Sequence, residues 1–317
     1  MHFSVSNVDV ALWIPPLVAF VISFFTSMGG VSGAFLILPF QVSVLNFTSP
    51  AVSSTNLVFN IVAIPSGIYR YLKEDRMSWP LTWVVVVGTL PGVIIGAWVR
   101  ILYLPDPRTF KLFVGLVLLY VGIKLVVEML SQRKKNGDFN TPKITEELLK
   151  TAMKGKGADG KPLARVKTLE FTMTRISYEF YGEIFSFPTW TVFSLAFAVG
   201  IVGGIYGIGG GAIIAPFFVA ILRLPIYTVA GAALTGTFIT SVFGVIFYQF
   251  VAASFAPPNL TVAPDWLLGA LFGIGGLAGI YCGARMQKYM PALFIKIMLA
   301  VIIWGTGGQY VVQYWMK

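Results

Sequence analysis

Glycines and small polar side chains are the residues of this sequence that could hold a ligand. One cluster contains Gly29, Gly30, Ser32 and Gly33, and a second contains Gly207, Gly209, Gly210 and Gly211. Glycine leaves the backbone free to adopt positive φ and to approach a ligand closely. A helix that begins just after such a break presents unpaired N–H groups, and these attract anions. Each cluster is therefore predicted to form half of an anion site; the alternative is that the glycines only allow close helix packing.

Uncharged hydrogen-bond donors follow both glycine clusters. Asn56 and Asn60 stand one helical turn apart after the first cluster, and Thr235 and Thr237 follow the second. Amides and hydroxyls suit the oxygens of a sulfonate, sulfite or carboxylate. We expect Asn56 and Asn60 to contribute most to binding and Thr235 next, whereas the alternative role for each is hydrogen bonding between helices.

The two clusters belong to an internal repeat. Residues 30–40 return 177 positions later as residues 207–217, and the match continues without a gap to Gly67 and Gly244. Paired interruptions of apolar segments in the two halves of a membrane chain indicate a transport site.

The elements that position these residues are predicted to be membrane helices. The 317 residues are 56% hydrophobic and 11% charged, with a mean hydropathy of +0.80, which leaves too little polar surface for a soluble domain. Each half contains five apolar segments, at about 11–28, 33–47, 50–71, 81–104 and 110–130, then at about 189–206, 211–224, 226–251, 264–286 and 291–315. Segment 33–47 reaches only roughly 22 Å, against roughly 30 Å of hydrocarbon, so the segments flanking each glycine cluster are predicted to form a hairpin that dips into the membrane.

Charge sets the predicted topology. The stretch 131–187 contains eleven Lys or Arg and is assigned to the cytoplasm, whereas 252–263 has none and is assigned outside. Arg100 and Arg108 fall on the outer side and oppose this assignment. Each half must then cross the membrane an odd number of times, which inverts one repeat relative to the other; the alternative of four plus four spans makes them parallel.

The predicted fold is therefore an all-α polytopic membrane protein of two inverted structural repeats, each a short broken-helix hairpin plus three transmembrane helices. Residues 1–130 form the first membrane repeat, 131–187 a cytoplasmic connector and 188–317 the second membrane repeat. Within the connector, alternating apolar and polar residues over 165–187 predict a strand pair or a membrane-surface segment.

Catalytic and metal chemistry have little support in the sequence. Cys282 is the single cysteine and His2 the single histidine, so we expect no metal site, no cofactor and no enzyme activity. No Asp or Glu falls in the central part of a predicted span, where coupling ions commonly bind. The net charge of +10 lies beside the apolar segments, which indicates lipid headgroups rather than nucleic acid.

The glycine hairpin of both halves, followed in the first by Ala51-Val52-Ser53-Ser54-Thr55-Asn56-Leu57, resembles the TauE/SafE sulfite exporter family, also called TSUP or four-TMS-duplication permeases. The resemblance covers both membrane halves but not the 131–187 stretch. It implies a multi-pass protein of the bacterial cytoplasmic (inner) membrane, with export of sulfite or an organosulfonate such as sulfoacetate. The chain departs from thiosulfate-importing relatives, which rely on several cysteines, because Cys282 is alone.

Residues and resemblance together predict a secondary transporter that exports a small sulfur-containing anion by alternating access, as a uniporter driven by the membrane potential. The expected partners are that anion and membrane lipids, and we also consider a second copy of the chain in a homodimer. The alternatives are an anion channel, an importer of a related sulfur anion or carboxylate, or a membrane-embedded scaffold without transport. In the favoured case, segments 29–33 and 207–211 should lie face to face.

Overall fold

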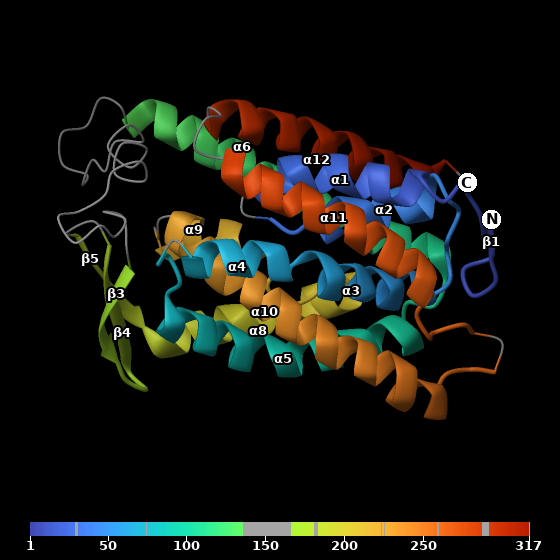
Figure 1. Ribbon diagram of the computed structural model, residues 1–317, viewed down its shortest axis with the longest axis horizontal. Helices are drawn as coiled ribbons and strands as arrows, with labels where there is room; N and C mark the ends of the chain where they lie inside the picture. The colour runs from blue at the N-terminus through green and yellow to red at the C-terminus, as the bar shows by residue number, and fades with distance from the viewer. Residues whose placement is uncertain are drawn as a thin grey trace.

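Apolar helices make up most of the protein (Figure 1). The computed structural model describes residues 1–316 except 29–30, 74, 136–165, 181–182, 223, 225, 259 and 287–291. The first half contains α1 (Ile14–Met28), α2 (Ala34–Ser43), α3 (Ala51–Ala63), α4 (Pro65–Lys73), α5 (Trp79–Leu102) and α6 (Pro107–Lys135). The second half contains α8 (Thr189–Tyr206), α9 (Ile214–Leu222), α10 (Ile226–Ile246), α11 (Trp266–Met286) and α12 (Ala292–Trp315), with a π-helical turn η1 (Phe247–Val251) and a short 3-10 turn η2 (Ala252–Ser254) after α10.

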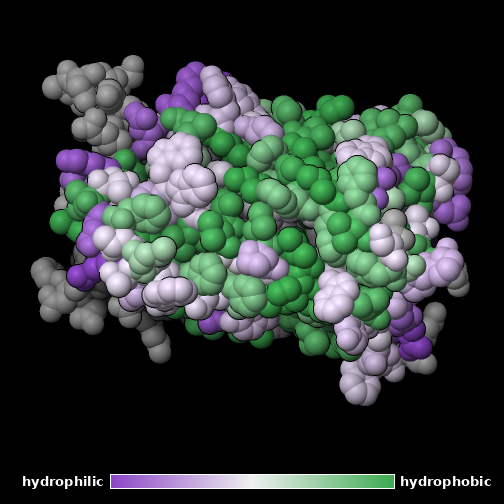
Figure 2. Space-filling model, turned by 90° about the horizontal axis from the view of Figure 1, so that it is seen from below, coloured by the Kyte–Doolittle hydropathy of each residue, from purple (hydrophilic) through white to green (hydrophobic). Residues whose placement is uncertain are grey.

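The helices confirm the predicted class, an all-α polytopic membrane protein. Within the described residues, five helical stretches are long and apolar enough to cross a bilayer: 51–73, 79–102, 189–206, 228–251 and 266–286. Figure 2 shows apolar side chains gathered across the middle of one face and hydrophilic ones toward its two ends. Trp79, Trp190 and Trp266 are exposed at the first turns of α5, α8 and α11, where interfacial aromatic residues are expected.

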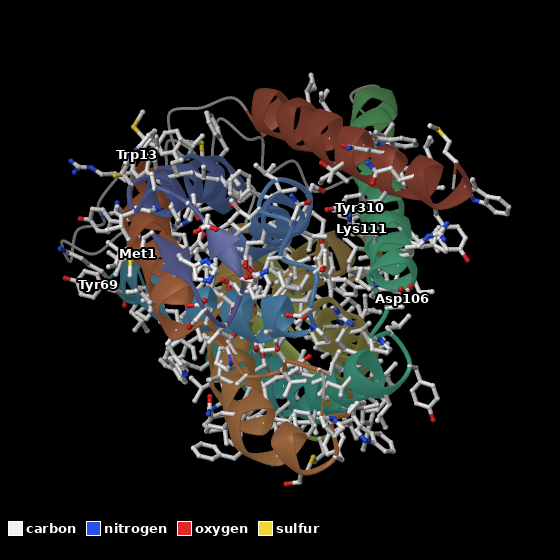
Figure 3. All side chains as sticks on the ribbon, turned by 90° about the vertical axis from the view of Figure 1, so that its right-hand side faces the viewer. Met1, Trp13, Tyr69, Asp106, Lys111 and Tyr310 are labelled. Carbon is white, nitrogen blue, oxygen red and sulfur yellow. The ribbon has the colours of Figure 1, made fainter. Side chains whose placement is uncertain are left out.

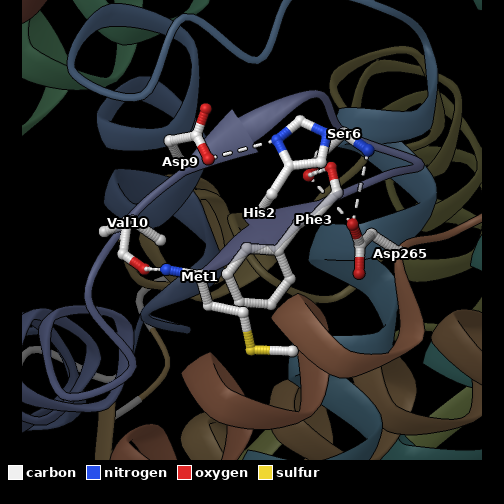
Figure 4. A network of polar contacts seen from close by, with 7 residues as sticks. All are labelled: Met1, His2, Phe3, Ser6, Asp9, Val10 and Asp265. Carbon is white, nitrogen blue, oxygen red and sulfur yellow. Dashed lines mark hydrogen bonds and ion pairs between the residues drawn. The ribbon is translucent and has the colours of Figure 1, made fainter.

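Both termini lie at one end of the molecule, which we call the terminal end (Figure 1). A small hairpin of β1 (His2–Phe3) and β2 (Val8–Asp9) covers this end. The buried carboxylate of Asp265 accepts hydrogen bonds from the Ser6 backbone N–H and hydroxyl (Figure 4). Its other oxygen accepts from the Leu268 N–H. The N-terminal segment is thereby fastened to the beginning of α11.

A three-stranded antiparallel sheet occupies the opposite end, which we call the sheet end. Its strands are β3 (Val166–Phe171), β4 (Arg175–Phe180) and β5 (Glu183–Pro188). The predicted strand pair was one strand short, because residues 183–188 also pair with β4, from Phe180 opposite Glu183 to Arg175 opposite Pro188. The hydroxyl of Tyr178 shares a 2.7 Å hydrogen bond with that of Thr228 in α10, and burial raises the pKa of Tyr178 above its ordinary value.

Helices that hold corresponding places in the two halves run antiparallel where they meet. In α6 and α12, Gly115 lies against Tyr310 while Gly122 lies against Trp304, so the two helices run in opposite directions. The α3–α4 pair also runs antiparallel to α10, since Leu57 contacts Gly244 and Gly67 contacts Leu234.

The other extensive helix contacts also join the two halves, but they pair helices that do not correspond to each other. The first helix of one half, α1, packs parallel along α11, and its counterpart α8 packs parallel along α5. Gly88 lies against Ala196 and Gly96 against Ile205, and close approaches of this kind need a residue without a side chain. Each hairpin is therefore held by a long helix of the other half.

Candidate anion-binding site

The two glycine breaks form hairpin tips that enter the molecule from opposite ends. Helix α1 follows β2 at the terminal end, whereas α8 follows β5 at the sheet end (Figure 1). Gly207 ends α8 in the left-handed conformation, with φ 80°, and Gly209 also has positive φ, 82°. At these two positions glycine is required by the backbone itself.

Asn56 connects the two hairpins. Its Nδ2 donates to the carbonyl of Ala34, 3.1 Å away in the first hairpin, and to that of Gly207, 2.9 Å away in the second. The side chain is fully buried on the second turn of α3. A single amide from the first half therefore holds backbone atoms of both halves.

Asn60, one turn further along α3, makes a second connection. Its Nδ2 donates to the Ile208 carbonyl at 2.9 Å and to Ser241 Oγ at 3.1 Å, while its Oδ1 accepts from Ser32 Oγ at 2.8 Å. Ser32, Gly33, Asn56, Asn60 and Gly207 are thus brought together, as a face-to-face arrangement requires. Gly29 and Gly30 lie outside the described residues.

At each tip one backbone N–H group donates to a hydroxyl group, and others donate to backbone carbonyls, as Val31 does to Thr26 and Ile208 to Gly203. Gly210 N–H donates to Thr240 Oγ1 at 3.0 Å, and Ala34 N–H donates to Ser32 Oγ at 3.3 Å. The expectation that a helix begins directly after Gly211 is wrong, because α9 begins at Ile214. The Ile214 N–H bonds back to the Gly211 carbonyl, so residues 211–214 form a turn before the helix.

The two predicted threonines have different surroundings. Thr237 lies against Gly209 and Gly211, and its hydroxyl donates to the Ala233 carbonyl at 2.8 Å. Thr235 is half-buried; its hydroxyl donates to the Gly231 carbonyl at 2.9 Å and faces Met77 Sδ at 3.9 Å. The structure places Thr237 at the second tip and Thr235 away from the two asparagines.

Further polar residues join the contact, among them Gln41 and Tyr206, which were not predicted. Gln41 Nε2 lies 3.5 Å from Asn56 Oδ1, and the Tyr206 hydroxyl donates to the Phe35 carbonyl at 2.9 Å. Thr240 and Ser241 contribute the hydroxyls described above. The signals for Gln41 and Tyr206 were an amide within an apolar helix and a tyrosine directly before a glycine break.

The contact is built unequally by the two halves. The residues that stand 177 positions after Asn56 and Asn60 are Ala233 and Thr237. Both bridging amides therefore come from the first half, and the second half supplies the carbonyls that accept from them.

The donors of this site are uncharged, buried amides and hydroxyls, which can donate hydrogen bonds to the oxygens of an anion. In the part of the chain that the structure describes, no three His, Cys, Asp or Glu side chains lie together as metal ligands would. A hollow between α6, α8 and α9 is lined by apolar side chains such as Phe113, Val199 and Phe217, so it does not match an anion.

Comparisons with known proteins identify the family of the chain. The family described as sulfite exporter TauE/SafE matches residues 16–310. A probable membrane transporter protein, YunE of Bacillus subtilis (strain 168), is 22% identical over 296 residues, covering 90% of this chain and 92% of that protein. No solved structure matches the chain. This chain is a membrane transporter and belongs to the sulfite exporter TauE/SafE family.

Proposed function

We propose that this transporter exports a small sulfur-containing anion, sulfite or an organosulfonate such as sulfoacetate, across the bacterial cytoplasmic membrane. The observation that carries the proposal is the Asn56 amide, which donates at once to Ala34 of one hairpin and Gly207 of the other. A buried amide with both N–H groups directed at opposing hairpins is suited to an anion that both hairpins share.

In the proposed mechanism the anion replaces backbone carbonyls as the acceptor of these amides. An anion oxygen between the tips accepts from Asn56 and Asn60 in place of Gly207 and Ile208. Hydrogen bonds to charged groups are about twice as strong as those between neutral groups, so the exchange is favourable for an anion and not for a neutral solute. Because the replaced bonds join the two halves, binding releases one hairpin from the other.

Inverted repeats would turn this release into alternating access. The antiparallel contacts of α6 with α12, and of α3–α4 with α10, support a pseudo-two-fold axis in the membrane plane. Release of the α1–α2 hairpin opens the site to the terminal end, and release of the α8–α9 hairpin opens it to the sheet end. By the charge rule, the sheet end faces the cytoplasm.

Export of an anion needs no second ion when the cell interior is negative. The membrane potential contributes about 2.3 kcal/mol per elementary charge per 100 mV toward the outside. The absence of carboxylates among the predicted site residues is consistent with such a uniporter.

Thermal-shift measurements on the purified protein test the anion specificity. We expect sulfite or sulfoacetate to raise the apparent melting temperature more than taurine, which carries no net charge. The same measurement with sulfate, thiosulfate and acetate shows which oxyanion stabilises the protein most. Asn56→Ala should lose this response, whereas Gln309→Ala, which removes an exposed amide of α12, should keep it. Stabilisation by cations or neutral solutes alone would contradict the proposal.

A further inference from the structure

Arg100 is a fully buried charge on the last turn of α5, near the terminal end. Its Nη1 donates to the Leu104 carbonyl, and its guanidinium lies 3.7 Å from the centre of the Phe110 ring. These contacts use one nitrogen and one face of the group. They leave the other edge of the guanidinium unsatisfied.

That other edge is formed by Nε and Nη2, and neither nitrogen has a hydrogen-bond partner among the described residues. Together these two N–H groups form the side of arginine that binds two oxygens of a carboxylate, sulfonate or phosphate in parallel. No ion pair of Arg100 occurs within the described residues. Asp106 is the acid that acts on it electrostatically, but Asp106 Oδ2 accepts from the N–H groups of Arg108 and Thr109 (Asp106 is labelled in Figure 3, a view onto the terminal end).

A buried hydroxyl group, that of Tyr248, lies near Arg100, because Tyr248 packs in one buried cluster with Ala97 and Ile101, which flank Arg100 on α5. The Ser53 side chain in turn lies beside the Tyr248 hydroxyl. Both oxygens are buried, and neither has a hydrogen-bond partner of normal geometry among the described residues. Tyr248 belongs to the π-helical turn η1, a type of distortion found frequently at functional sites.

Ser53 links this group to the hairpin contact. A side chain added at Gly207 would overlap Ser53, so the serine lies directly against the second tip. Ser53 also precedes Asn56 by about one turn of α3. The buried cation, the two hydroxyls and the Asn56 amide therefore follow one another from the terminal end toward the hairpin tips.

We propose that Arg100, Tyr248 and Ser53 form a second anion station between the hairpin contact and the terminal end. Its ligand is an oxyanion with two adjacent oxygens, which the free guanidinium edge binds side by side while the hydroxyls donate to it. An unpaired buried charge is costly, and the bound anion compensates that cost. The inference rests on the proposed function in one respect: the ligand is taken to be the transported anion, on its way to or from Asn56.

The test compares folded variants for binding of sulfoacetate, measured by thermal shift, and for its KM in proteoliposomes. Arg100→Gln should weaken binding at least tenfold, and Arg100→Lys should be intermediate because it keeps the charge but not the two-pronged edge. Tyr248→Phe and Ser53→Ala should each weaken binding several-fold. The matched control is Arg108→Gln, which removes an exposed arginine at the same end of the molecule and should bind like the wild type.

Arg100→Met separates binding from structure. Without ligand it should melt at or above the wild-type temperature, because an uncompensated charge is removed, yet it should not respond to sulfoacetate. A lower melting temperature with an unchanged response would show that Arg100 serves only the Leu104 carbonyl, and would overturn the station. If that variant does not fold, wild-type affinity in both Tyr248→Phe and Ser53→Ala overturns it instead.

The outcomes also separate the station from the proposed export. If the wild type transports sulfoacetate and Arg100→Gln has the same KM, the second station is refuted and the proposed export is not. Arg100-dependent binding of sulfoacetate without any flux keeps the station and removes export.

Discussion

Asn60 makes three side-chain hydrogen bonds at the hairpin contact. Asn60→Ala would leave the Ile208 carbonyl and the Ser32 and Ser241 hydroxyls buried without this partner. Each unsatisfied buried group costs about 1–3 kcal/mol, so the apparent melting temperature should fall by several degrees. Gln309→Ala is the control with an exposed amide. An Asn60→Ala protein as stable as the wild type would show that these bonds do not hold the halves together.

Gly207 tests the backbone of the second tip. Gly207→Ala introduces a side chain at φ 80° and against Ser53, so it should lower both stability and flux. Gly305→Ala in α12 meets nothing within 4 Å and should stabilise its helix by about 1 kcal/mol. Adding Ser53→Gly to Gly207→Ala should restore only part of the loss, since it removes the overlap with Cβ and Oγ of residue 53 but leaves the overlap with its Cα and the backbone strain. Equal melting temperatures for Gly207→Ala and Gly305→Ala would refute this account of the tip.

Part of the hairpin contact could be predicted from the sequence because some of its signals are local. Asn56 and Asn60 stand out as amides one turn apart in an apolar helix, and the structure places both between the hairpins. For Arg100 the sequence predicts only a charge near a segment end. Its burial depends on contacts between helices, such as that with the Phe110 ring of the next helix, and no local pattern reports such contacts.

At the scale of elements, the antiparallel packing of α6 against α12 can be measured by cross-linking. In a Cys282→Ala background, the pair Gly115→Cys and Tyr310→Cys should form a disulfide, as should Gly122→Cys with Ile303→Cys. The pair Gly115→Cys with Ile303→Cys is offset by about two turns, roughly 10 Å, and should not. Cross-linking of the offset pair alone would contradict the observed direction of these helices.

Helix boundaries were largely predictable because apolar length and glycine breaks are encoded along the chain. The segment predicted at 264–286 is α11 (Trp266–Met286), and the short segment at 33–47 contains α2 (Ala34–Ser43). The third strand and the turn before α9 were missed. Both depend on pairing partners, β4 for the strand and the Gly211 carbonyl for the turn, rather than on composition.

For the whole molecule, the two ends should face opposite sides of the membrane. Ser4→Cys at the terminal end and Thr172→Cys at the sheet end are exposed positions for labelling, again with Cys282→Ala. A membrane-impermeant thiol reagent should label Ser4→Cys in intact cells and Thr172→Cys in inverted vesicles. Labelling of both from the same side would contradict the topology.

The central claim is that an anion passes between the two hairpins by replacing bonds that hold the halves together. Counterflow of labelled sulfoacetate and sulfite in proteoliposomes tests it most directly, because only a carrier exchanges substrate against a trans pool with saturation. We predict saturable counterflow for the wild type and at least a tenfold loss in folded Asn56→Ala, with Gln309→Ala unchanged. Flux without saturation or counterflow, or wild-type exchange in Asn56→Ala, would contradict the account.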